Sequence, residues 1–279
     1  YKGVQKRSAL IVGAISIFIY ISVVSNKYYK AVDSQNKFGF HISLLHNPSG
    51  AAEFIKRHSI KGPAFSDYFV SSYMMWSMYP DFKSYIDLRD LDIYSPDFFE
   101  QYMQLIQHPE KFKDLDEKYN FNYVVISTSQ LLKLQLDLYW KKGYNMVYVD
   151  PVAAIFLKES ESNNAINSNL QIQSLFTWPR NIDEPKWCSA LNHFMNPYYS
   201  LEDEKENMAP VYAALFYDQV QNYPLAINIL LPQMNALRDN LYARGTMAKV
   251  YKDYANVTED PELRKRREDT ASYFVRGMR

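Results

Sequence analysis

Hydrophobic residues form one long uninterrupted run near the start of the chain, from Ala9 to Val24. As a helix, the uncharged stretch from Ser8 to Ser25 would be roughly 27 Å long, which matches the hydrocarbon core of a bilayer. A core helix of this length usually carries polar residues along one face, and a signal peptide has a shorter apolar region and a better cleavage site than Val23–Ser25. We therefore expect a transmembrane helix within residues 1–25, with a signal peptide and a core helix as the alternatives.

The ends of this run bear on its orientation and context. Three basic residues lie upstream and three follow, and the upstream ones are closer to the run, which faintly favours a cytoplasmic N-terminal side and an external body. The chain begins at Tyr1 without a methionine. We therefore expect the run to be the last span of a longer polytopic protein.

After a polar connector at 26–47, the pattern alternates between short apolar runs typical of strands and amphipathic segments typical of helices. The expected strands are residues 63–68, 83–88, 121–127, 145–149 and 153–157. The expected helices are residues 50–58, 70–78, a helix from Ser95–Pro96 that breaks near His108–Pro109, and 130–142.

The order of these elements predicts the fold of residues 48–159. Strands separated by helices are joined by crossovers, so we expect a small three-layer α/β domain with a mostly parallel sheet. The last two strands are separated only by the tight turn at Asp150–Pro151, and should form an antiparallel hairpin at one edge.

The rest of the chain predicts helices. Residues 160–176 are rich in Ser, Asn and Gln and indicate a linker, and residues 177–279 indicate an all-helical domain. Ala214 and Tyr217 recur 34 positions later as Ala248 and Tyr251, which is the tetratricopeptide period; a generic helical bundle is the alternative. With fewer than three clean copies, such a domain should lean on the α/β domain for stability.

Composition narrows the function classes. Lys plus Arg and Asp plus Glu each total 31, so the formal net charge is zero and a nucleic-acid partner is not expected. Cys188 is the only cysteine, which excludes a disulfide within the chain and a cysteine-based metal site. The five histidines are scattered and no glycine-rich phosphate loop is present, so we predict neither a metal site nor a cofactor.

The most suggestive polar cluster is Asp67, Asp87, Arg89, Asp90 and Asp92. Asp67 and Asp87 follow expected strands, at the sheet edge where open α/β folds bind ligands. Asp67, Asp87, Arg89 and Asp90 are therefore the candidate ligand-binding residues. The structural alternative is that the acids cap helices and that Arg89 pairs with Asp67 or Asp87 to fix two loops.

Two sets of aromatic residues bear on candidate binding surfaces. Tyr217, Tyr223 and Tyr251 in the helical region are the candidate partner-binding residues. A second set at helical spacing is more typical of a buried core than of a sugar-stacking platform, and consists of Tyr73, Trp76 and Tyr79.

From Pro48 to Leu157 the order of features resembles a domain of the bacterial C-type glycosyltransferase superfamily, polytopic membrane proteins in which it follows the last membrane helix. The resembling segments are AAEFIKRHSIKGPAFSDY, SSYMMWSMYPDFKSYIDLRD, KYNFNYVVIS and GYNMVYVDPVAAIFLK. The family pattern has glycines where this chain has Ser71, Ser72 and Leu88. The resemblance implies a position outside the bacterial cytoplasmic membrane, and it implies no catalytic residue here, because the family's catalytic acids lie in loops between earlier membrane helices.

Together these features favour a membrane-tethered extracytoplasmic accessory domain of a glycosyltransferase-like cell-envelope protein. Its expected partners are membrane lipid, a lipid-linked sugar or its acceptor, and proteins that meet the helical tail. The alternative is a single-span scaffold or interaction subunit of a cell-envelope assembly.

Overall fold

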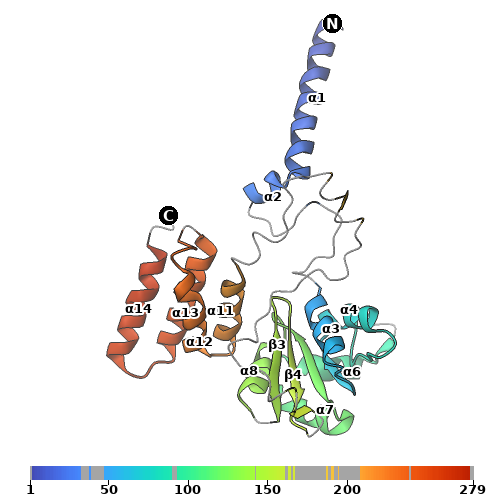
Figure 1. The fold of residues 1–279 in the computed structure, drawn as a ribbon, viewed down its shortest axis with the longest axis vertical. Helices are drawn as coiled ribbons and strands as arrows, with labels where there is room; N and C mark the ends of the chain where they lie inside the picture. Colours follow the sequence, from blue (N-terminus) through green and yellow to red (C-terminus); the bar gives the residue numbers. More distant parts are fainter. Residues whose placement is uncertain are drawn as a thin grey trace. The chain divides into compact units, whose positions relative to one another are not determined.

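In the computed structural model (Figure 1), the described residues are 2–32, 38, 47–89, 93–141, 143–160, 208–238 and 240–276, with a few isolated positions between 163 and 194. They belong to two compact units. One comprises residues 1–43 and 181–204, and the other comprises residues 44–180 and 205–279. The α/β region and the helical tail therefore share one unit.

The first unit contains the long apolar helix α1 (Lys2–Val24), followed by the short helix α2 (Lys27–Ala31). The segment Arg7–Val24 has a mean hydropathy of 2.0 and is long and apolar enough to cross a membrane. Its side chains are not packed inside this chain, and those of Leu10 and Phe18 are 74 % and 71 % exposed. This exposure argues against the core-helix alternative, whereas a signal sequence has the same features.

The sheet of the second unit is mixed, with the strand order β1-β2-β4-β3. Its strands are β1 (Ala64–Ser66), β2 (Tyr123–Ser127), β3 (Tyr144–Val149) and β4 (Ala153–Lys158). Only β1 and β2 pair in parallel, whereas β4 is antiparallel to both β2 and β3. The expectation of a mostly parallel sheet is therefore wrong, while that of a terminal antiparallel hairpin is confirmed.

The apolar composition of β4 explains why the sheet is mixed and not mostly parallel. The crossover through α8 (Leu132–Trp140) makes β3 run in the same direction as β2, but it leaves one strand position open between them. The run Ala153–Leu157 is apolar at every residue and fully buried, as suits a central strand covered on both faces. β4 therefore turns back into that position and leaves the less buried β3 at the edge.

The segment 83–88, expected to be a strand, is irregular. Its apolar side chains are nevertheless buried, including those of Tyr85 and Ile86. It is connected to β1 by side chains, since the Ser84 and Ser66 Oγ atoms lie 3.1 Å apart. The hydrophobic pattern therefore indicated burial correctly, although no strand pairing accompanies it.

Helices α3 (Ser49–Arg57), α4 (Tyr68–Met78), α6 (Pro96–Gln104) and α7 (Phe112–Tyr119), together with α8, complete the α/β region (Figure 1). Alternate strand residues join two buried clusters: Val125 and Ile155 pack with α3 and α4, whereas Val124 and Phe156 pack with α6, α7 and α8. Ser95 caps α6 as predicted, and a 3₁₀ turn at Pro109–Lys111 separates it from α7.

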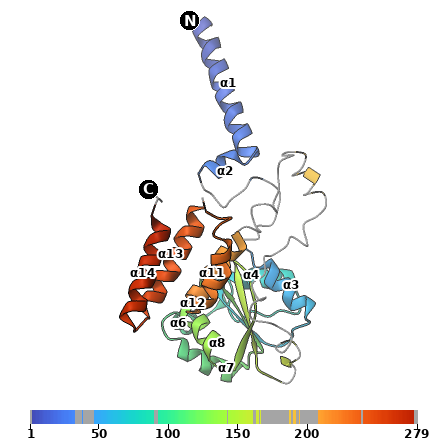
Figure 2. The ribbon, with the colours of Figure 1, turned by 60° about the vertical axis from the view of Figure 1, so that its left-hand side comes forward.

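The described part of the tail is helical, as predicted, and is drawn in orange to red in Figure 2. It comprises α11 (Ala209–Gln219), α12 (Tyr223–Leu230), a 3₁₀ turn (Leu231–Gln233), α13 (Leu241–Asn256) and α14 (Pro261–Val275). Of the expected linker, only residues 160, 163, 164 and 166 are described.

The tail leans on the α/β region through α8, as expected for so few helices. Trp140 Nε1 donates a 2.6 Å hydrogen bond to the Val220 carbonyl, and Asn222 Nδ2 donates one of 2.8 Å to the Tyr139 hydroxyl. The Tyr139 and Tyr217 rings lie 6.4 Å apart, and one continuous hydrophobic cluster includes residues of both regions. The turn between α11 and α12 is thus fixed to the surface of α8.

Trp140→Phe keeps an aromatic ring but removes the hydrogen bond to Val220. We expect the free energy of unfolding to fall by about 0.5–1.5 kcal/mol, the usual contribution of one such bond. Urea titration in detergent micelles, followed by circular dichroism, measures this loss. Trp76→Phe, on α4, is the matched control and should change stability less; an equal loss in both variants would contradict the docking role of Trp140.

Candidate functional site

Asp67 joins the ends of two strands to the start of a helix. Its side chain is fully buried, and its Oδ1 accepts hydrogen bonds from the backbone N–H groups of Phe69 (2.7 Å) and Val70 (3.0 Å), at the first turn of α4. Its Oδ2 accepts the N–H of Ser127, the last residue of β2. Burial raises the pKa of Asp67 to about 6, although these three N–H donors oppose the rise. Asp67 is thus a helix cap and strand connector, as the structural alternative predicted.

Asp87 and Arg89 form the ion pair that sequence analysis allowed. The Asp87 carboxylate is buried and receives two charge-assisted hydrogen bonds, from Arg89 Nε at 2.9 Å and from an Arg89 terminal nitrogen at 2.7 Å. The Arg89 backbone N–H (2.9 Å) and the Tyr94 hydroxyl (3.0 Å) also donate to it, and the Arg89 side chain, with these donors, holds the pKa of Asp87 below its usual value. The side chain of Arg89 remains 59 % exposed, so the pair fixes a guanidinium group at the surface.

The structure does not unite the candidate cluster. None of the hydrogen bonds or ion pairs found among the described residues joins Asp67 to Asp87 or Arg89, since Asp67 is bound to β2 and the other two are bound to each other. Asp90 and Asp92 lie outside the described residues. Of the four ligand-binding candidates, Arg89 is therefore the described one whose polar group is both fixed and accessible.

Serine hydroxyls occupy the interior beside Asp67. The Ser71 hydroxyl lies within hydrogen-bond distance of the Asp67 carbonyl and 3.0 Å from Ser66 Oγ. Ser71 and Ser66 are both fully buried. The interior beside Asp67 is therefore filled by hydrogen-bonded side chains.

A second buried carboxylate stabilises the β3–β4 turn. Asp150 accepts the N–H groups of Val152 (2.7 Å) and Ala153 (2.8 Å) and the hydroxyl of Tyr148 (2.7 Å). Complete burial raises the pKa of Asp150 to about 6. The sequence indicated this turn from Asp150–Pro151 but did not indicate a carboxylate buried at its centre.

The candidate partner-binding tyrosines lie mostly inside the tail. Tyr217 and Tyr223 are buried, at 1 % and 7 % exposed, and Tyr223 stacks on Tyr254 with ring centres 5.1 Å apart. Tyr251 is half-buried and stacks on Phe274 at 6.1 Å. The first two therefore have almost no surface for a partner.

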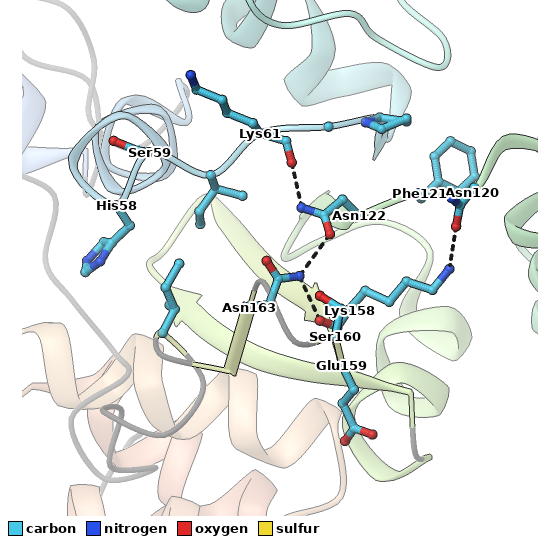
Figure 3. Close-up of a pocket in the computed structure, with 14 residues that line it drawn as sticks. His58, Ser59, Lys61, Asn120, Phe121, Asn122, Lys158, Glu159, Ser160 and Asn163 are labelled. Carbon is cyan, nitrogen blue, oxygen red and sulfur yellow. Dashed lines mark hydrogen bonds between the residues drawn. The ribbon is translucent and has the colours of Figure 1, made fainter.

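A hollow of about 680 Å³ lies at the end of the sheet opposite Asp67, where β1 and β2 begin (Figure 3). Its amides are already paired: Asn122 Nδ2 donates to the Lys61 carbonyl at 2.6 Å, and Asn163 Nδ2 donates to Asn122 Oδ1 at 2.9 Å. Lys158 Nζ is paired with Asp116 at 2.9 Å. Sequence analysis did not identify this hollow, which forms from segments up to about a hundred residues apart: 58–63, 120–122, 158–160, 163 and 166.

The described residues contain no group of three or more His, Cys, Asp or Glu side chains arranged to hold a metal. Comparisons with protein-family models, curated proteins and solved structures found no match to this chain.

The two raised carboxyl pKa values predict a pH dependence of stability. Each of these carboxyl groups has a pKa of about 6 in the folded chain and near 3.8 in the unfolded chain. Its protonation therefore stabilises the fold; this contribution is fully present below pH 3.8 and is lost as the pH rises through about 6. Lowering the pH from 7 to 5 should therefore raise the unfolding free energy by about 1 kcal/mol for each of Asp67 and Asp150. Urea titrations across this range measure the slope.

Asp67→Asn tests the assignment of this slope. Its amide would face the Ser127 N–H as a second donor, so we expect a loss of about 1–3 kcal/mol at neutral pH and roughly half of the pH slope. Asp114→Asn changes an exposed acid on α7 and should leave the slope unaltered. A wild-type slope in Asp67→Asn would disprove the role of Asp67 in it.

Gly62, on the rim of the hollow, can be tested against a second glycine. Gly62 and Gly143 have φ angles of +108° and +115°, so alanine is strained at both positions. A Cβ at Gly62 would lie 3.0 Å from Asn122 Cβ, whereas nothing lies within 4 Å at Gly143. We expect Gly143→Ala to cost about 1 kcal/mol and Gly62→Ala to cost more, as measured by thermal unfolding; equal costs would contradict the close approach at Asn122.

Proposed function

We propose that this chain is a membrane-tethered accessory module of a glycosyltransferase-like protein of the bacterial cell envelope. Its body lies outside the cytoplasmic membrane and positions a lipid-linked sugar or its acceptor. The observation that carries this proposal is the exposed guanidinium of Arg89, held by two hydrogen bonds to the buried carboxylate of Asp87.

The chemistry of Arg89 suits a phosphate group of such a donor. A guanidinium is planar and always charged, and its remaining N–H groups can bind a phosphate while the other edge stays on Asp87. Because Arg89 lowers the pKa of Asp87, the carboxylate stays ionised at neutral pH and keeps the guanidinium oriented. A preorganised cation loses less conformational freedom on binding than a free side chain does.

The proposal is limited to binding because the buried carboxylates already have structural partners. The oxygens of Asp67 and Asp150 accept backbone N–H groups, and those of Asp87 are held by Arg89 and Tyr94. Such engaged carboxylates are poor general bases, because a base must reach a substrate proton. We assign the chain a positioning role accordingly.

We further propose a three-layer arrangement for the α/β region and a tetratricopeptide-like pairing for the tail. The two buried clusters on opposite sides of the strands support the first. The buried Ala214 and Ala248, 34 residues apart on α11 and α13, support the second.

Arg89→Ala tests the phosphate-binding role. We expect the full chain in nanodiscs to bind a polyprenyl-phosphate-linked sugar roughly tenfold more weakly, and Arg89→Lys to give an intermediate loss because it keeps the charge without the fork. Native mass spectrometry measures the bound fraction. Arg57→Ala is the matched control, since Arg57 also pairs with a carboxylate at the surface, that of Glu53 on α3.

Wild-type binding by Arg89→Ala, with an unchanged circular dichroism spectrum, would overturn the proposal. An equal loss in Arg57→Ala would also overturn it, because the effect would then reflect general surface charge.

A scaffold function is the second candidate, and α14 supports it. This last described helix of the tail exposes Tyr273 (68 %) and Leu263, as expected where a further repeat or a partner protein packs. Loss of co-purifying proteins in Tyr273→Glu, with lipid binding retained, would favour the scaffold over the accessory module.

A further inference from the structure

Helix α4 presents an aromatic face to solvent, which we define as Phe69, Tyr73, Trp76 and the following Tyr79. Residues 69, 73 and 76 share one side of the helix. Phe69 and Trp76 are exposed, whereas Tyr73 is half-buried and also packs against the core cluster that contains the buried side of α4. Trp76 and Tyr79 are 68 % and 85 % exposed. The expectation that these two residues belong to a core is therefore wrong.

One basic residue is hydrogen-bonded to α4, and others lie near α4 in the sequence. Lys56, in the last turn of α3, donates a 3.2 Å hydrogen bond from its Nζ to Ser77 Oγ on α4. Lys61 and Lys83 are also exposed, before β1 and after α4. Among residues 50–84, four basic side chains are exposed, whereas only two acidic side chains, those of Glu53 and Asp81, are exposed or half-buried. Glu53 is moreover paired with Arg57. The segment 50–84, which contains α4, therefore carries an excess of exposed positive charge.

We propose that the aromatic face of α4 lies in the headgroup region of the bilayer that α1 spans. This inference depends on the membrane tether of the proposed function. Trp and Tyr concentrate at membrane–water interfaces, where an apolar ring and a polar tip are both accommodated. The neighbouring lysines complement anionic lipid headgroups, and each cation near such a surface strengthens binding about fivefold.

The tether favours the bilayer over other occupants. The connector at 26–47 has 22 residues, so it can extend at most about 80 Å, and the folded unit cannot leave the vicinity of the membrane. A covalent connection of this length raises the effective concentration of the folded unit at the membrane, so that even a weakly binding patch is occupied. A soluble protein has no such advantage.

Quenching of Trp76 fluorescence by brominated lipids tests the proposal. The full chain is reconstituted into vesicles of phosphatidylcholine and phosphatidylglycerol, with bromine near the headgroup end of the acyl chains. The difference between wild type and Trp76→Phe isolates the Trp76 signal. We expect it to be quenched several-fold more strongly than the Trp140 signal, isolated by Trp140→Phe, because Trp140 is similarly exposed (59 %) but lies on α8, bonded to the tail.

Further variants and lipids sharpen the result. The double variant Phe69→Ser/Tyr79→Ser should weaken Trp76 quenching while the circular dichroism spectrum stays unchanged, because both side chains are exposed. Omitting phosphatidylglycerol should weaken it as well.

Flotation of the vesicles separates the two proposals. A chain that fails to float has no α1 tether, which overturns both the proposed function and this inference. A chain that floats with Trp76 unquenched, or quenched no more than Trp140, overturns this inference alone. Unquenched Trp76 emission that shifts as protein density rises would assign the face to a second copy and would also overturn it.

Discussion

The placement of β4 is the constraint on which the rest of the folded unit depends. Each residue of Ala153–Leu157 is fully buried, and the strand pairs with β2 on one side and with β3 on the other. Because β4 separates two strands that run in the same direction, it connects the crossover through α8 to the rest of the sheet. Its alternate residues contribute to both hydrophobic clusters, so the helices on each side pack against it.

This arrangement gives the carboxylates of the unit different tasks. Asp150 holds the turn that returns β4 into the sheet, and Asp67 joins the carboxyl ends of β1 and β2 to the first turn of α4. Both are desolvated, and both use their oxygens on backbone N–H groups that would otherwise be buried without partners. Asp87 instead holds a side chain that reaches solvent, and the proposed phosphate contact of Arg89 depends on this difference.

The surface of the chain is notable for where apolar groups remain exposed. They include the side chains of α1, the aromatic face of α4 and the outer side of α14. Large exposed aromatics on a folded unit point to an interaction, because water is a poor environment for them. The proposed membrane tether, interfacial contact and packing at the end of the tail are compatible roles for one chain.

The apolar runs, with the turn and helix-start signals between them, allowed much of the fold to be predicted from sequence. The helix α1, the break between α6 and α7, the β3–β4 hairpin and the helical tail follow from local patterns: the run at 9–24, the Ser95–Pro96 and His108–Pro109 steps and the turn at Asp150–Pro151. The pairing of Arg89 with Asp87, two residues apart, was likewise within reach of sequence reasoning.

Tertiary structure alone decided the remaining features. The sheet order, the irregular path of 83–88 and the exposure of Trp76 depend on which surfaces meet across long sequence separations, and an apolar residue does not specify its partner. The position of Asp67 after a strand predicts a carboxylate open to ligands at the end of the sheet. In the fold, the backbone N–H of Ser127, sixty residues later, donates to its Oδ2. Local geometry can be predicted from sequence because turns, helix caps and apolar runs involve residues only a few positions apart. Burial and charge pairing depend on contacts that only the folded chain brings together.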